Sequence, residues 1–188
     1  MKPRAFVPEK LDLAAFIHDG ASLAGEWPAA SLERLAESAA PDAPAQGWPA
    51  LHWRLLGETR PVKGGKAQAW LQVTAQVEVA LTCQRCLKPV HEHVDIDRWI
   101  RFVDTEAEAA ALDADSDDDV LAMPRHLDAR ELIEDEVLLA LPLVPRHEVC
   151  PEPLSHVDDA DEPADEDGEG ERPNPFAALA ALKRGGSA

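Results

Sequence analysis

Two short pairs of metal-binding residue types, far apart in the chain, constrain its fold more than any other feature of the sequence. The first pair is a C-x-x-C, Cys83 and Cys86, and the second is an H-x-x-C, His147 and Cys150. These pairs contain all 3 cysteines of the chain. Two such residues on a tight turn direct their side chains at one point, and three thiolates with one imidazole make a tetrahedral zinc site. The spacing therefore predicts that the two pairs converge and hold a structural zinc ion.

Free thiols at a former zinc site, or buried apolar cysteines, are the alternatives to bound zinc. A thioredoxin-like redox motif is disfavoured because it requires a helix directly after a strand, whereas Pro89 and an alternating run follow here. A disulfide is typical of secreted proteins, and the chain opens Met-Lys-Pro-Arg without the apolar segment of a signal peptide. We therefore expect a cytoplasmic protein with reduced thiols.

Three runs that alternate apolar and polar residues predict three β-strands. They begin near Trp48, Ala69 and Pro89, and the last ends near Val103. A Gly-Gly turn joins the first two runs, and the C-x-x-C joins the second to the third. A parallel pairing would need a crossover of about a dozen residues or more, so these short connections disfavour it. The strands are expected to form an antiparallel sheet in which the C-x-x-C is a hairpin knuckle.

An amphipathic helix is predicted after the sheet. Asp128 is a favourable N-cap, Glu131 stands three positions later, and Pro142 prevents the helix from continuing. A second helix is expected from Pro28 to Ser38, in an N-terminal part whose pattern is otherwise mixed. The predicted fold class is therefore α+β, a single domain over residues 1–150 with an antiparallel sheet and a covering helix.

The net charge of −18 comes from two acidic segments. Residues 104–120 contain 8 acidic side chains and residues 152–171 contain 10, with no lysine or arginine in either. Segments of this composition cannot bury enough apolar surface to offset the entropy of ordering. The sequence thus predicts a disordered insert at about 104–119 and a disordered linker at 151–172.

A short amphipathic helix is predicted at 173–184, beyond the acidic linker. Asn174 can cap it, and Phe176, Leu179 and Leu182 form its apolar stripe. A helix this short is not stable alone, so the stripe needs a surface to bind. We therefore expect these three residues to bind a partner, with docking on the chain's own domain as the alternative.

Two other groups of titratable residues are weaker site candidates. His91 and His93 share a strand face with two aspartates, which favours a solvated surface over a metal site. Glu131 and Asp135 lie one helical turn apart, but no nucleophile or phosphate-binding loop accompanies them. The sequence therefore indicates no catalytic residues.

Three segments together resemble the YceD family, the large ribosomal RNA subunit accumulation proteins of bacteria and plastids. They are residues 81–89 around the C-x-x-C, residues 134–147 at the end of the expected helix, and residues 173–183. The resemblance implies a non-enzymatic ribosome-biogenesis factor that supports the synthesis, processing or stability of large-subunit (23S) ribosomal RNA. It supplies no catalytic residues.

The expected partners of such a factor are a ribosomal precursor particle, a ribosomal protein or rRNA, and neither a membrane nor a small-molecule substrate is expected. The net charge of +3 between Arg54 and Arg101 is compatible with a contact to RNA. One alternative is a module that sequesters a basic ribosomal protein through the acidic segments. The other is a metal-dependent RNA-processing enzyme, which needs an open coordination position that a closed Cys₃His site lacks.

Overall fold

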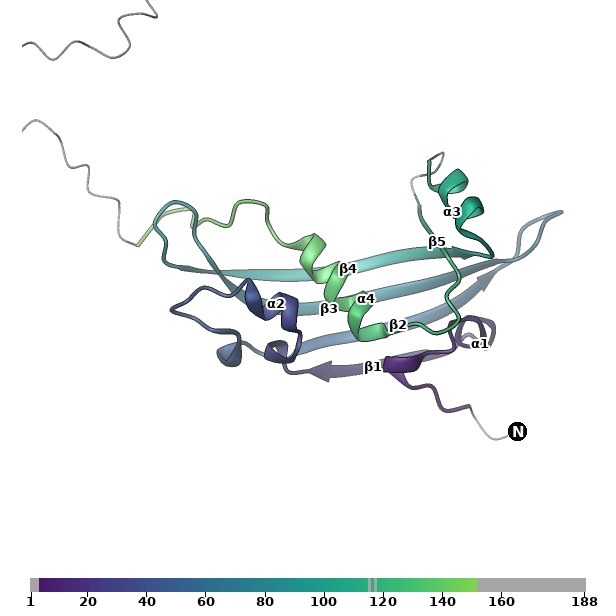
Figure 1. Cartoon of the computed structure of the whole chain (residues 1–188), viewed down its shortest axis with the longest axis horizontal. Helices are drawn as coiled ribbons and strands as arrows, with labels where there is room; N and C mark the ends of the chain where they lie inside the picture. Colours follow the sequence, from purple (N-terminus) through teal and green to yellow (C-terminus); the bar gives the residue numbers. More distant parts are fainter. Residues whose placement is uncertain (1–3, 115, 117, 152–188) are drawn as a thin grey trace, which may run out of the picture. The chain divides into compact units, whose positions relative to one another are not determined.

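The computed structural model describes residues 4–114, 116 and 118–151. Its main feature is a five-stranded sheet in which the strands follow chain order (Figure 1). The strands are β1 (Ser22–Trp27), β2 (Leu51–Arg60), β3 (Gln68–Thr82), β4 (Pro89–Val103) and β5 (Asp119–Ala122). The three alternating runs of the sequence form β2, β3 and β4, which pair as antiparallel neighbours. The α+β fold class and the hairpin knuckle between β3 and β4 are as predicted.

The sheet is mixed rather than wholly antiparallel, because β5 pairs parallel to β4. The crossover between them contains helix α3 (Glu106–Asp113), where the sequence predicted a disordered insert at 104–119. That prediction is wrong over the helix. Thr105 caps α3 by accepting a hydrogen bond from the Glu108 N–H at 3.2 Å, and Ala109 packs into a small apolar cluster with β4 and β5. The cap and this contact stabilise a segment for which the acidic composition had predicted disorder.

The N-terminal part adds an edge strand that the sequence pattern did not resolve. β1 pairs antiparallel with β2 and places Gly25 opposite Trp53. A Cβ at Gly25 would lie 3.0 Å from the Trp53 ring, which itself stacks on Trp27 with ring centroids 4.5 Å apart. Glycine thus interrupts the apolar alternation of β1 at the position where the neighbouring tryptophan needs the space.

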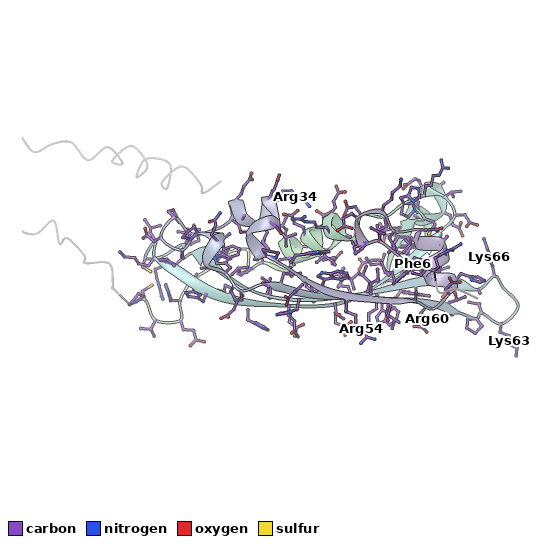
Figure 2. All side chains as sticks on the ribbon, turned by 90° about the horizontal axis from the view of Figure 1, so that it is seen from below. Phe6, Arg34, Arg54, Arg60, Lys63 and Lys66 are labelled. Carbon is purple, nitrogen blue, oxygen red and sulfur yellow. The ribbon has the colours of Figure 1, made fainter. Side chains whose placement is uncertain are left out.

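Three helices cover one face of the sheet (Figure 1 and Figure 2), namely α1 (Leu13–His18), α2 (Glu33–Glu37) and α4 (Ala129–Ala140). Helix α4 begins after its predicted cap, Asp128, whose carboxylate accepts hydrogen bonds from the Arg130 and Glu131 N–H groups. Helix α2 is shorter than the predicted helix at 28–38, because a separate 3₁₀ turn, Ala29–Ser31, precedes it. The core lies between these helices and the sheet, with fully buried side chains that include Phe16, Leu35, Leu71 and Ile133.

Candidate metal centre

The four predicted ligand residues lie together at one end of the β3–β4 hairpin. One ligand atom from each of Cys83, Cys86, His147 and Cys150 lies within 4.8 Å of the other three. The Cys86 Sγ and the His147 Nδ1 are 3.4 Å apart. Ligand atoms of a tetrahedral zinc site are separated by about 3.5 to 4 Å, given metal distances of about 2.3 Å to sulfur and 2.0 Å to nitrogen. The four groups could therefore close around one metal ion after small movements.

The first pair is shaped by the tight turn between β3 and β4. The Cys83 N–H donates to the Lys88 carbonyl and the Leu87 N–H donates to the Cys83 carbonyl, both at 2.9 Å. Leu87 has a φ of 59°, the left-handed conformation that usually requires glycine. This reversal returns the chain directly into β4, which leaves both thiols on the inside of the turn.

Arg85, between the two cysteines of the first pair, holds the second pair in place. Its guanidinium donates to the His147 carbonyl at 2.8 Å, to the Glu148 carbonyl at 3.1 Å and to the Cys150 Sγ at 3.0 Å. The Gln84 N–H donates to the Pro145 carbonyl at 2.8 Å. Neither residue is predictable from the local sequence, because their partners lie more than 60 positions away in the chain.

The His147 ring is oriented by a backbone group. Its Nε2 lies 3.0 Å from the Pro89 carbonyl oxygen, which can only accept a hydrogen bond. Nε2 therefore carries the proton, and the lone pair of Nδ1 is directed toward the thiol of Cys86. Ligand histidines in zinc sites are commonly fixed in this way by a carbonyl or carboxylate behind the ring. This orientation is a second respect in which the group fits zinc.

The turn also favours ionisation of its first thiol. Burial of Cys83 raises its pKa, but hydrogen bonds from the backbone N–H groups of Cys86, Arg85 and His147 lower the pKa to about 5. A thiolate is the form that binds metal. One ligand of the group is thus available as a thiolate at neutral pH.

The pKa of the second thiol of the turn, Cys86, shifts in the opposite direction. The Lys88 N–H lowers the pKa of Cys86, but burial and the neighbouring thiols of Cys150 and Cys83 raise it above its ordinary value. The hydrogen bond to Cys150 raises the pKa of Arg85, so this guanidinium stays positively charged beside the sulfur atoms. A soft cation at the centre would relieve the repulsion among three thiolates, which is the chemistry that a Cys₃His set can perform.

The weaker candidates are surface groups or helix contacts. The side chains of His91 and His93 are exposed on β4. Asp135 pairs with Arg34 of α2, as expected of a solvated helix face. Glu134, which was not predicted as a functional residue, is 8% exposed and accepts hydrogen bonds from the Leu35 N–H at 3.0 Å and from Arg34 at 3.3 Å. Glu134 joins α4 to α2, and no local sequence pattern predicts this contact.

The proposed partner-binding residues Phe176, Leu179 and Leu182, with the predicted linker and C-terminal helix, lie outside the described residues. Within the part of the chain that is described, no helix is long and apolar enough to cross a membrane.

A sequence model of the family described as large ribosomal RNA subunit accumulation protein YceD matches residues 71–183, which is more than half of the chain. The chain belongs to the YceD family. The range that matches YceD includes most of β3, all of β4 and α4, the four residues of the metal centre and the predicted C-terminal motif. The YceD description concerns accumulation of large-subunit ribosomal RNA and names no metal, partner or reaction. No solved structure matches the chain.

Proposed function

We propose that this YceD protein is a non-enzymatic ribosome-biogenesis factor that supports the synthesis, processing or stability of 23S ribosomal RNA. The observation that carries the proposal is the convergence of Cys83, Cys86, His147 and Cys150 inside the range that matches the family. This centre joins the segment after α4 to the end of the sheet. We propose that it holds a structural zinc ion that fixes this end of the molecule for binding.

The donor set supports a structural role for the ion rather than a catalytic one. Three thiolates and one imidazole fill the tetrahedral shell of zinc and leave no position for water or substrate. When bound, zinc would supply a cross-link between the knuckle and the segment at 147–150. The chain's own groups orient that cross-link, since Arg85 holds the second pair and the Pro89 carbonyl holds the His147 ring.

The proposed partners are a ribosomal precursor particle, a ribosomal protein or rRNA. The apolar stripe of Phe176, Leu179 and Leu182 is the proposed docking motif, and the acidic residues at 152–171 separate it from the domain in the sequence. An apolar stripe after a polar, charged segment is a common arrangement for a tethered peptide that binds another protein. Sequestration of a basic ribosomal protein is the alternative that an experiment on partners should distinguish.

The test is complementation of a strain that lacks this gene. The ratio of 23S to 16S ribosomal RNA would be compared after expression of the full chain, of Cys83→Ser/Cys150→Ser, and of a chain ending at residue 172. We expect the full chain to restore the ratio, and the other two to fail although they accumulate to the same level. A normal ratio in the deletion strain itself would refute the proposed function.

A pull-down of the tagged full chain, with and without RNase, distinguishes the partners. Loss of all co-purifying proteins after RNase indicates contact through rRNA, and a ribosomal protein that remains indicates direct protein binding. A free ribosomal protein without ribosomal RNA or particles would favour sequestration. Phe176→Ala should weaken the protein contact, because aromatic anchors carry much of the energy of small interfaces.

A further inference from the structure

The face of the sheet that α1, α2 and α4 leave open carries a group of basic side chains between the middle of β2 and the β2–β3 turn. Arg54 and Arg60 project from β2 on this face, and Lys63 lies in the turn (Figure 2). Arg101 of β4 lies on the same face, because it stands opposite Trp70 in the β3–β4 register and Trp70 in turn stands opposite Glu58 of β2. We name Arg54, Arg60, Lys63 and Arg101 the basic patch.

Arg60 is the most rigidly held member of the basic patch. Its guanidinium lies over the Trp70 ring at 4.4 Å from the centroid and over the Trp99 ring at 4.1 Å. Stacking on aromatic rings orients a guanidinium without neutralising its charge. Glu58 is its one carboxylate neighbour among the described residues, at 3.2 Å. The edge of the guanidinium is thus pre-oriented to donate further hydrogen bonds, which reduces the entropy lost on binding an anion.

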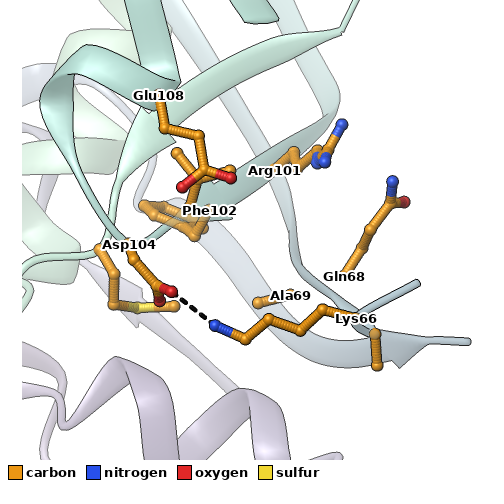
Figure 3. Close-up of a pocket in the computed structure, with 10 residues that line it drawn as sticks. Lys66, Gln68, Ala69, Arg101, Phe102, Asp104 and Glu108 are labelled. Carbon is orange, nitrogen blue, oxygen red and sulfur yellow. Dashed lines mark hydrogen bonds and ion pairs between the residues drawn. The ribbon is translucent and has the colours of Figure 1, made fainter. Parts of the chain in front are cut away.

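Of the remaining members of the basic patch, Arg54 and Arg101 have carboxylates in their surroundings but form no close ion pair with them in the described part of the chain. Within the described ranges, Arg54, Lys63 and Arg101 form no ion pair. Lys66 differs, because it pairs with Asp104 in a pocket at the end of the hairpin (Figure 3). Arg101 also lines that pocket, but its charge is not paired with a described residue there, whereas the charge of Lys66 is. We therefore exclude Lys66 from the basic patch and keep Arg101.

Carboxylates border the basic patch on the side toward the knuckle, where Arg54 and Asp97 both stand opposite Thr74 in the register. Asp97, beside the basic patch, accepts a hydrogen bond from Gln72 at 2.6 Å. Further toward the knuckle, the same face carries Glu78 and Asp95. The carboxylates on this face thus lie mainly on the knuckle side of Arg54, and an anionic partner would be directed to the half that lies near the β2–β3 turn.

We infer that the basic patch binds the phosphate backbone of RNA. Base stacking is not favoured, because Arg60 lies over the rings of both Trp70 and Trp99, and Trp70 is only 5% exposed. A protein partner is not favoured either, since protein interfaces need an apolar centre, and Leu56 is the one aliphatic side chain of β2 that faces this side. The inference rests on the proposed function only for the identity of the RNA. That this surface binds an RNA backbone does not depend on the proposed function.

Binding is tested with the full chain and a fluorescently labelled RNA of about 20 nucleotides, longer than a typical single-domain footprint. Fluorescence polarisation would be measured over a series of salt concentrations. The variant Arg54→Gln/Lys63→Gln/Arg101→Gln removes three charges of the basic patch. The control Lys10→Gln/Lys88→Gln/Arg125→Gln removes three exposed charges elsewhere and has the same net charge.

Each phosphate contact contributes about 0.7 to the slope of log affinity against log salt for a single strand. The basic-patch variant should therefore show a slope smaller by about 2 and an affinity lower by roughly a hundredfold at 0.1 M salt. The control should keep the wild-type slope. If removal of Arg101 disturbs the fold, judged by the melting temperature, Arg54→Gln/Lys63→Gln serves instead and should lower the slope by about 1.4.

Three results would overturn the inference. They are no binding of RNA by the wild-type chain at low salt, equal losses in the basic-patch variant and its control, and loss of an RNase-resistant protein partner in the basic-patch variant alone. None of these would refute the proposed function, which fails only if 23S rRNA accumulates normally without the chain. The two ideas therefore fail on different measurements.

Discussion

Removal of zinc is expected to release the segment at 142–150 and to leave the sheet folded. Four hydrogen bonds with oxygen acceptors hold this segment to the knuckle, through Gln84, Arg85 and His147. At about 1 kcal/mol net for each bond, they contribute about 4 kcal/mol. Fixing the backbone of about nine residues costs roughly 10 kcal/mol, somewhat less here because two are prolines. The hydrogen bonds alone therefore do not hold the segment in place.

The proposed zinc ion would reverse that balance. Structural zinc binds small Cys and His sites with an apparent free energy of about 10 to 16 kcal/mol near neutral pH, which exceeds the remaining deficit. The buried core, by contrast, lies between the helices and the middle of the sheet and includes Phe16, Leu71 and Ile133. The effect should thus be local, with an intact domain after the metal is removed.

Limited trypsin digestion measures the release, because Arg146 is exposed and lies inside the segment. We expect cleavage after Arg146 to accelerate at least tenfold when a strong chelator is added to zinc-loaded protein, and to slow again when zinc is restored. Cleavage after Arg125, an exposed site outside the segment, is the internal control and should not change. Cys150→Ser should be cleaved rapidly with or without chelator.

The reasoning would be refuted by zinc-loaded protein whose cleavage after Arg146 is indifferent to the chelator. It would also be refuted if Arg125 became equally sensitive, because the metal would then stabilise the whole domain. If protein purified without chelator contains no zinc, the centre consists of structural thiols only.

Three further substitutions test the packing. Gly57→Ala should lower the unfolding free energy by about 1 to 3 kcal/mol, because its Cβ would lie 2.7 Å from the Cα of Ile17; Gly47→Ala, with nothing within 4 Å, is the control in urea unfolding. Leu87→Gly should raise stability by up to about 1 kcal/mol by relieving the left-handed backbone, since the side chain is 70% exposed, and Leu87→Ala should give no gain. Burial raises the pKa of Glu136 more than a nearby arginine lowers it. Its charged form is thus disfavoured in the folded state, and stability falls as pH rises from its unfolded pKa through the raised folded value. Glu136→Gln should accordingly increase the melting temperature at pH 7 but not below about pH 4; an equal increase at both pH values would contradict this.

The sequence predicted best where one local pattern determines the structure. The alternation around Leu71 correctly predicted β3, and the cap at Asp128 correctly predicted the start of α4. The knuckle was predictable because ligand residue types are rare in this chain and their spacing is characteristic. In each case the residues that form the feature are neighbours in the chain or have restricted chemistry.

The features that were missed depend on contacts between distant segments. β1 was missed because Gly25 stands where an apolar residue would complete the alternation, and the ring of Trp53 fills that space. For α3 a local signal did exist, since Thr105 and Glu108 have the spacing of a capping box, but the acidic composition was given more weight. The parallel pairing of β5 was missed for the same reason, because such pairing needs a crossover and α3 is that crossover.

The length of the hairpin separates the metal centre from the basic patch. β3 and β4 each contain 15 residues, and a strand of that length spans about 50 Å. The knuckle connects the two strands at one end, and Gln68 and Phe102 lie near the other end, beside the basic patch. A metal at the knuckle cannot reach an anion bound there, and charge interactions over such a distance are screened at physiological salt. The hairpin therefore serves as a rigid spacer, with the zinc-ordered segment proposed at one end and the surface for RNA backbone proposed near the other.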